Sequence, residues 1–173
     1  MMKPITTLVV LLALPLALAA CGEKKTERTF TTADGSTMKV EQQDGEGAAK
    51  ITATSANGTA TLTTGGAGQW PAGLADFAPA YPGGEVGASF SGSSNDGAGG
   101  MVTFTTSDSP EKVVEFYKAR AAAAGLSDVS TMDINGAKMF GAKDEKTGRS
   151  LSIQASVADG KTTAAVTFGS EKK

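Results

Sequence analysis

The chain has 173 residues, with 16 basic and 18 acidic side chains and no histidine. A net charge of −2 argues against a nucleic-acid partner, which would require a basic face, and against electrostatic attraction to an anionic bilayer. The absence of histidine excludes a histidine-dependent catalytic triad and a zinc site built on imidazole ligands.

The N-terminal segment has the pattern of an export signal. Met1–Lys3 supplies a positive charge, and the run from Ile5 to Ala20 is apolar apart from two threonines. This run stops short of the roughly 20 residues that a spanning helix needs. It ends in Leu18-Ala19-Ala20-Cys21, which contains the single cysteine of the chain. This stretch resembles the lipobox of bacterial lipoproteins.

The lipoprotein resemblance implies cleavage between Ala20 and Cys21 and attachment of a diacylglycerol to the Cys21 sulfur. Acyl chains such as palmitate then hold the protein to the membrane, and two or more chains hold it firmly. Gly22, rather than an aspartate, follows the cysteine. In that family this favours the outer membrane of a two-membrane bacterium, facing the periplasm. An uncleaved anchor helix, or a secretory signal followed by a free thiol, are the alternatives.

The leader, residues 1–20, is followed by a lipidated tether, 21–28, and a β-meander, 29–64. The tether is charged and lacks an apolar period, which is typical of a linker. In the meander, short alternating runs are separated by turn dipeptides such as Asn57-Gly58. One strand face would carry Met38, Val40, Ile51, Ala53 and Leu62. Because these five apolar side chains are few for about four strands, we expect the meander to pack against another element or to remain mobile.

Residues 65–84 are predicted to be a linker, because they are too rich in proline and glycine for a regular element. We expect Trp70, Phe77 and Tyr81 to pin this linker onto a core. An exposed aromatic patch that docks a partner is the alternative.

Residues 85–170 are predicted to form the main domain, with a polar tail at 171–173. The stretch Ser107–Glu111 is a helix start, with a capping side chain and a proline in the first turn, and Gly125 is a helix stop, which together predict a helix at about 110–124. The glycine run at 97–100 precedes a strand rather than a helix, which argues against a phosphate loop. Alternating runs predict strands at 86–91, 101–105, 127–134, 137–143, 149–157 and 161–168. The last four are joined by turns at Asn135-Gly136, Asp144–Gly148 and Asp159-Gly160.

These elements predict an α+β fold: an antiparallel β-sheet with one main helix (about 110–124) packed on one face, preceded by a β-hairpin-rich N-terminal segment. The stretch from Tyr81-Pro82-Gly83 through Asp108–Tyr117 to Gly125 resembles a pattern in uncharacterised bacterial envelope lipoproteins. This second resemblance covers about residues 81–126. It implies a helix-on-sheet domain and brings no known active site.

No catalytic, metal-binding or cofactor-binding motif stands out in the sequence. We therefore expect a protein that is not an enzyme: a lipid-anchored cell-envelope protein, held to the membrane through Cys21. It would act as a non-catalytic interaction or structural module with an envelope protein partner.

The alternative is a small-ligand-binding periplasmic lipoprotein. Its pocket would be lined by several of the aromatic residues Trp70, Phe77, Tyr81, Phe104 and Tyr117. An enzyme that uses paired carboxylates ranks last. Asp108 and Glu111 fit a helix start, and the other candidate carboxylates fit loops or turns: Asp76, Asp133 and Asp159.

Overall fold

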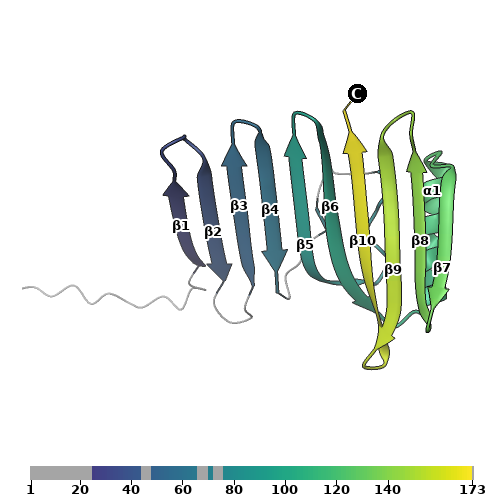
Figure 1. Ribbon diagram of the computed structural model, residues 1–173. Helices are drawn as coiled ribbons and strands as arrows, with labels where there is room; N and C mark the ends of the chain where they lie inside the picture. Colours follow the sequence, from purple (N-terminus) through teal and green to yellow (C-terminus); the bar gives the residue numbers. More distant parts are fainter. Residues whose placement is uncertain (1–24, 44–47, 66–69, 72–75, 173) are drawn as a thin grey trace, which may run out of the picture.

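The computed structural model describes residues 25–43, 48–65, 70–71 and 76–172. The leader and Cys21 lie outside these residues. The described part forms ten strands and one helix (Figure 1): β1 (Lys25–Thr31), β2 (Thr37–Gln43), β3 (Ala49–Ser55), β4 (Gly58–Thr64), β5 (Glu85–Ser94), β6 (Gly97–Thr106), α1 (Pro110–Ala123), β7 (Asp128–Ile134), β8 (Ala137–Asp144), β9 (Arg149–Ala158) and β10 (Lys161–Glu171).

All ten strands belong to one antiparallel sheet in the order β1-β2-β3-β4-β5-β6-β10-β9-β8-β7. The chain runs as a meander from the β1 edge of the sheet inward to β6. It then crosses through α1 to the far edge and returns as a second meander that ends with β10 beside β6. The second hairpin series has the predicted turns: Asn135 and Asp159 adopt a left-handed φ of 50° ahead of a glycine.

The helix begins and ends where the sequence predicts. Ser109 caps it, because its side chain accepts a hydrogen bond from the Lys112 N–H at 3.4 Å, and Pro110 occupies the first turn. Gly125 follows the helix with φ 76°, and the Leu126 N–H donates to the Ala121 carbonyl at 3.0 Å. The helix packs across β8, β9 and β10.

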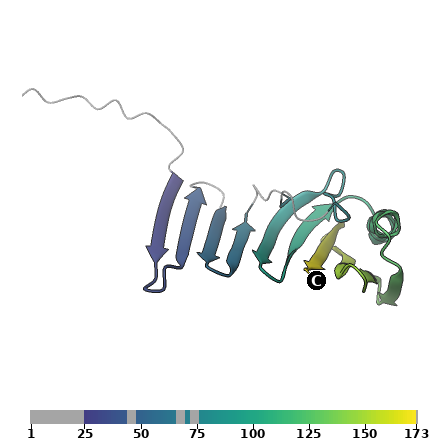
Figure 2. The ribbon, with the colours of Figure 1, turned by 90° about the horizontal axis from the view of Figure 1, so that it is seen from above.

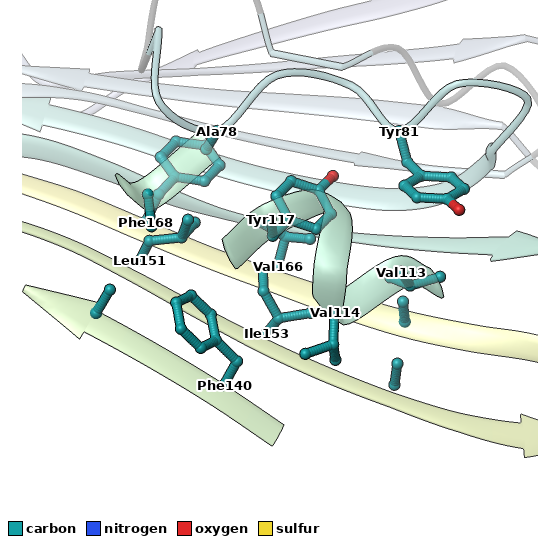
Figure 3. Close-up of a cluster of buried hydrophobic side chains, with 14 of the residues drawn as sticks. Ala78, Tyr81, Val113, Val114, Tyr117, Phe140, Leu151, Ile153, Val166 and Phe168 are labelled. Carbon is teal, nitrogen blue, oxygen red and sulfur yellow. The ribbon is translucent and has the colours of Figure 1, made fainter. Parts of the chain in front are cut away.

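The core lies between α1 and one face of the sheet. Figure 3 shows Tyr117 of α1 directed at the sheet, with Ile153 and Val166 beneath it; all three side chains are fully buried. The segment before β5 covers the same face, because Phe77 and Tyr81 are buried in this cluster and Trp70 packs against it. The prediction that these aromatic residues pin the linker onto the core is confirmed.

The predicted α+β class is wrong, because strands dominate the described residues and the helix has only 14 residues. The N-terminal hairpins do not form a segment of their own in front of a helix-covered domain. They extend the sheet sideways, since β4 pairs with β5 from Gly58 opposite Ser94 to Thr64 opposite Ala88. Figure 2 shows the consequence: α1 lies over one end of the sheet, and the described residues place no helix over β1–β4.

The first strand starts earlier than expected. β1 begins at Lys25, within the segment 21–28 that the sequence predicts to be a tether. In sequence, only Gly22, Glu23 and Lys24 separate Cys21 from this strand.

Candidate functional site

The two faces of the sheet carry different side chains. Val102 and Phe104 of β6 point into the core, so Met101, which directly precedes Val102, points to the opposite face. Residues that pair directly on neighbouring strands point to the same face. Met101 lies opposite Phe90, and Phe90 lies opposite Leu62, so all three point to this opposite face. We call this side, away from α1, the open face.

The open face carries no charged side chain from β2 to β4, nor along β5 from Ala88 onward. Lys39, Glu41 and Lys50 all point to the other face of these strands. The positions on the open face are Met38, Val40, Gln42, Ala49, Ile51, Ala53, Ser55, Gly58, Ala60, Leu62, Thr64, Ala88, Phe90, Gly92 and Ser94. The sequence-based grouping of Met38, Val40, Ile51, Ala53 and Leu62 on one face is therefore confirmed.

Several large apolar side chains on the open face are exposed to solvent. Their exposed fractions run from 39% for Leu62 to 51% for Phe30, with Met38, Phe90 and Met101 between these values. Burial of a large apolar side chain is worth about 1.5–3 kcal/mol. Contiguous exposed apolar patches are typical of surfaces that bind a protein, a membrane or a ligand.

The same face is hollowed into an open trough of about 920 Å³ near the ends of the strands that lie farther from Lys25. Phe30 on β1 and Met38 on β2 line one end of the trough, and Phe90 on β5 also lines it. Its floor is built from positions with little or no side chain: Ala53, Ala60, Gly92, Gly99 and Gly169.

The floor glycines fall into two groups. At Gly99 a Cβ atom would lie 2.9 Å from the Phe168 carbonyl oxygen, so close strand approach requires glycine there. At Gly92 and Gly169 the nearest atoms would be 3.7 Å and 3.4 Å away, which leaves room for a side chain. Packing does not require glycine at these two positions, and its effect there is to keep the trough open.

The aromatic residues expected to line a ligand pocket fill space instead. Tyr81 stacks on Phe104 with a centroid separation of 5.3 Å, and the Tyr117 hydroxyl donates to the Pro79 carbonyl at 3.1 Å. The Trp70 Nε1–H donates to the Ala78 carbonyl at 2.9 Å. The space between α1 and the sheet is therefore packed at this cluster, and the hollow lies on the opposite face.

A family model described as START domain-like matches residues 86–167. The match is a similarity over just under half of the chain. It covers most of β5, all of β6, α1, β7, β8 and β9, and most of β10, and it excludes β1–β4. Comparison with curated proteins and with solved structures gives no match.

The candidate carboxylates have structural partners or turn positions. Asp108 accepts hydrogen bonds from the Tyr81 hydroxyl at 2.7 Å and from Lys112 Nζ at 2.8 Å. Lys112, first, and then Tyr81 lower the pKa of Asp108, whereas burial and then Asp108 raise the pKa of Tyr81 to about 12.

The other carboxylates are similarly engaged. Glu111 pairs with Lys138 at 3.2 Å, and Asp133 pairs with the same lysine. Asp159 holds a left-handed turn position, and Asp76 is exposed in the loop before Phe77. In the part of the chain that the structure describes, no three His, Cys, Asp or Glu side chains group as metal ligands.

Ala20 and Cys21, the predicted cleavage and lipidation residues, lie outside the described residues. Among the residues that are described, no helix combines the length and the apolar character required to cross a bilayer. The sequence contained the alternation that defines the open face. It gave no signal for the addition of Phe90 and Met101 to that face or for the trough, because both depend on the β4–β5 and β5–β6 pairings.

Proposed function

We propose that this protein is a lipid-anchored, non-catalytic binding module of the bacterial cell envelope that docks an apolar partner surface on its open face. One observation carries the proposal: large apolar side chains are exposed on a face that has no charge from β2 to β4 or along β5 from Ala88 onward. The centres of protein interfaces are depleted of charged residues in the same way.

The different coverage of the two sheet faces supports this proposal. A sheet with one apolar face is stable when that face packs against another layer. Within this chain, α1 and the segment before β5 cover the other face, and they do so over the C-terminal half. A partner that covers the open face would supply the missing layer for β1–β5.

The membrane attachment rests on Leu18-Ala19-Ala20-Cys21. Acylated Cys21 would anchor the protein, and Gly22 supports the outer membrane, facing the periplasm. Four residue steps separate Cys21 from Lys25, a reach of at most about 14 Å. The anchor would therefore hold the sheet close to the bilayer, with the Lys25 end of β1 nearer to it.

Mass spectrometry of the native protein tests the anchor. We expect a chain that begins at Cys21 and carries acyl chains, and we expect a Cys21→Ser variant to leave the membrane fraction or to keep its leader. An intact Met1 start, or an unmodified Cys21 thiol in a freely diffusing protein, would refute the anchor.

A thiol-labelling pair tests the docking face. Ala53 on the open face and its neighbour Thr54 on the other face are both exposed, and Cys21 is the only natural cysteine. In intact cells, we expect a membrane-permeant maleimide to label Ala53→Cys several-fold more slowly than Thr54→Cys. Equal rates would contradict docking on this face.

The second candidate function is binding of a small apolar ligand in the trough. Its volume lies within the range of about 300–1,000 Å³ typical of ligand pockets, and the START domain-like match supports a ligand-binding domain. A ligand that binds only the folded state stabilises it by RT ln(1 + [L]/Kd), so the unfolding temperature rises with ligand concentration. A thermal-shift screen of envelope metabolites, with Gly92→Leu to fill the trough, would identify such a ligand.

A further inference from the structure

We propose that the partner on the open face is a second copy of this chain, in a two-fold symmetric sandwich whose axis runs parallel to the strands above β4. This inference rests on the proposed docking function and names its partner. Two sheets packed face to face lie about 10 Å apart with strand directions within about 30° of each other. A two-fold axis along the strands reverses the strand order of the second copy and keeps each row of residues opposite itself.

The trough row of the sheet is complementary to itself under this operation. From β1 to β10 its side chains change from large to absent, in the order Phe30, Met38, Ala53, Ala60, Gly92, Gly99 and Gly169. With the axis above β4, Phe30 faces Gly169, Met38 faces Gly99, and Ala53 faces Gly92. Each large side chain of one copy therefore enters the trough of the other.

The adjacent row stacks apolar side chains on one another. Its order is Arg28, Val40, Ile51, Leu62, Phe90, Met101 and Thr167. The same axis places Leu62 opposite Leu62, Ile51 opposite Phe90, and Val40 opposite Met101. The one charged residue of this row, Arg28, faces Thr167 at the rim, so no like charges meet within this row.

The contact area is sufficient for a stable pair. These two rows and the next open-face row toward Lys25 cross the strands from β1 to β10, the third row being Thr26, Gln42, Ala49, Thr64, Ala88, Thr103 and Ala165. Strands about 4.8 Å apart and three rows, or six residues per strand with a rise of about 3.3 Å each, give a footprint of roughly 30 Å by 20 Å. That is about 600 Å² on each copy and about 1,200 Å² for the pair. Specific interfaces bury about 1,200–2,000 Å² in total.

The symmetry also fits two anchors in one membrane. Because the axis is parallel to the strands, both copies of β1 run in the same direction, and both Lys25 residues lie at the same end of the pair. Both Cys21 residues would then reach the same bilayer. A two-fold axis across the strands would place the anchors at opposite ends.

Cross-linking in intact cells tests this arrangement. Facing backbones about 10 Å apart exceed the roughly 7 Å limit for a disulfide, so the probe is a bis-maleimide with a spacer of that length. Leu62→Cys lies on the proposed axis, and Thr59→Cys is an exposed control on the other face of β4. We expect Leu62→Cys to give a cross-linked dimer at least tenfold more efficiently than Thr59→Cys.

Two results would overturn the inference in different ways. If Ala53→Cys is protected in cells but Leu62→Cys gives no homodimer, another protein, a ligand or the membrane covers the face, and the second copy is wrong while docking stands. If Ala53→Cys labels as fast as Thr54→Cys and no dimer forms, both the docking function and the second copy are wrong.

A size exchange in the Leu62→Cys background tests the complementarity itself. Gly169→Leu adds a side chain opposite Phe30, and Gly169 has local room for it. We expect this change to reduce cross-linking at least tenfold and the added Phe30→Ala change to restore it, because the exchange returns one large and one small residue to each contact. Loss of cross-linking without recovery, in a double variant whose circular dichroism is native, would overturn the row pairing.

Discussion

Two phenylalanines on neighbouring strands give the sharpest test of the two-faced sheet. Phe104 on β6 is 1% exposed and contacts Tyr81 and Trp70 rings, whereas Phe90 on β5 points to the open face and is 45% exposed. Phe104→Ala removes a fully packed ring and should cost about 3–5 kcal/mol of unfolding free energy. Phe90→Ala removes about half of a burial worth 1.5–3 kcal/mol, so it should cost about 1 kcal/mol in an isolated chain.

Thermal unfolding followed by circular dichroism separates these values. At about 2–4 °C per kcal/mol for a chain of this size, Phe104→Ala should lower the unfolding temperature by roughly 6–20 °C and Phe90→Ala by about 2–4 °C in dilute solution. At high protein concentration the Phe90→Ala deficit should grow, because only the wild type gains stability from association.

Two outcomes would refute this reasoning. Equal losses for the two variants in dilute solution would mean that Phe90 is buried within a single chain. A Phe90→Ala deficit that is independent of protein concentration over a hundredfold range would argue against a role for this ring in association.

Three further predictions concern particular contacts. Tyr81→Phe should lower the unfolding free energy by about 1–2 kcal/mol in urea titrations, because it removes the 2.7 Å hydrogen bond to Asp108; no change would mean that the bond has no net value. Because the pKa of Tyr81 is raised to about 12, this residue stabilises the fold at pH values below its unfolded pKa near 10, and this contribution is lost between about pH 10 and 12. Tyr81→Phe should therefore show a smaller loss of stability over that interval, and an unchanged alkaline profile would contradict the assignment. Gly99→Ala should lower the unfolding free energy by about 1–3 kcal/mol, because the added Cβ would contact the Phe168 carbonyl. Gly92→Ala should be neutral or stabilising by up to about 1 kcal/mol in the same urea unfolding experiment. Equal effects would mean that the strands adjust freely at Gly99.

The elements that the sequence predicted correctly depend on residues close to one another in the chain. The helix at Pro110–Ala123 follows from the Ser109 cap and the Gly125 stop, which are local backbone chemistry. The turns at Asn135-Gly136 and Asp159-Gly160 follow from the left-handed conformations that these residues tolerate. Strand alternation likewise determined which side chains of β2, β3 and β4 share a face.

Pairing between distant strands was decided by the tertiary structure alone. The pairing of β4 with β5 joins residues about 30 positions apart in the chain, and no local sequence pattern specifies this pairing. This pairing joins the two meanders into one large sheet, places Phe90 and Met101 on the same face as Leu62, and forms the trough. The role of Gly99 was also invisible in the sequence, because it depends on the approach of a carbonyl from β10, almost seventy residues later in the chain. Local propensities set each strand and turn, whereas long-range hydrogen-bond register determined which side chains meet.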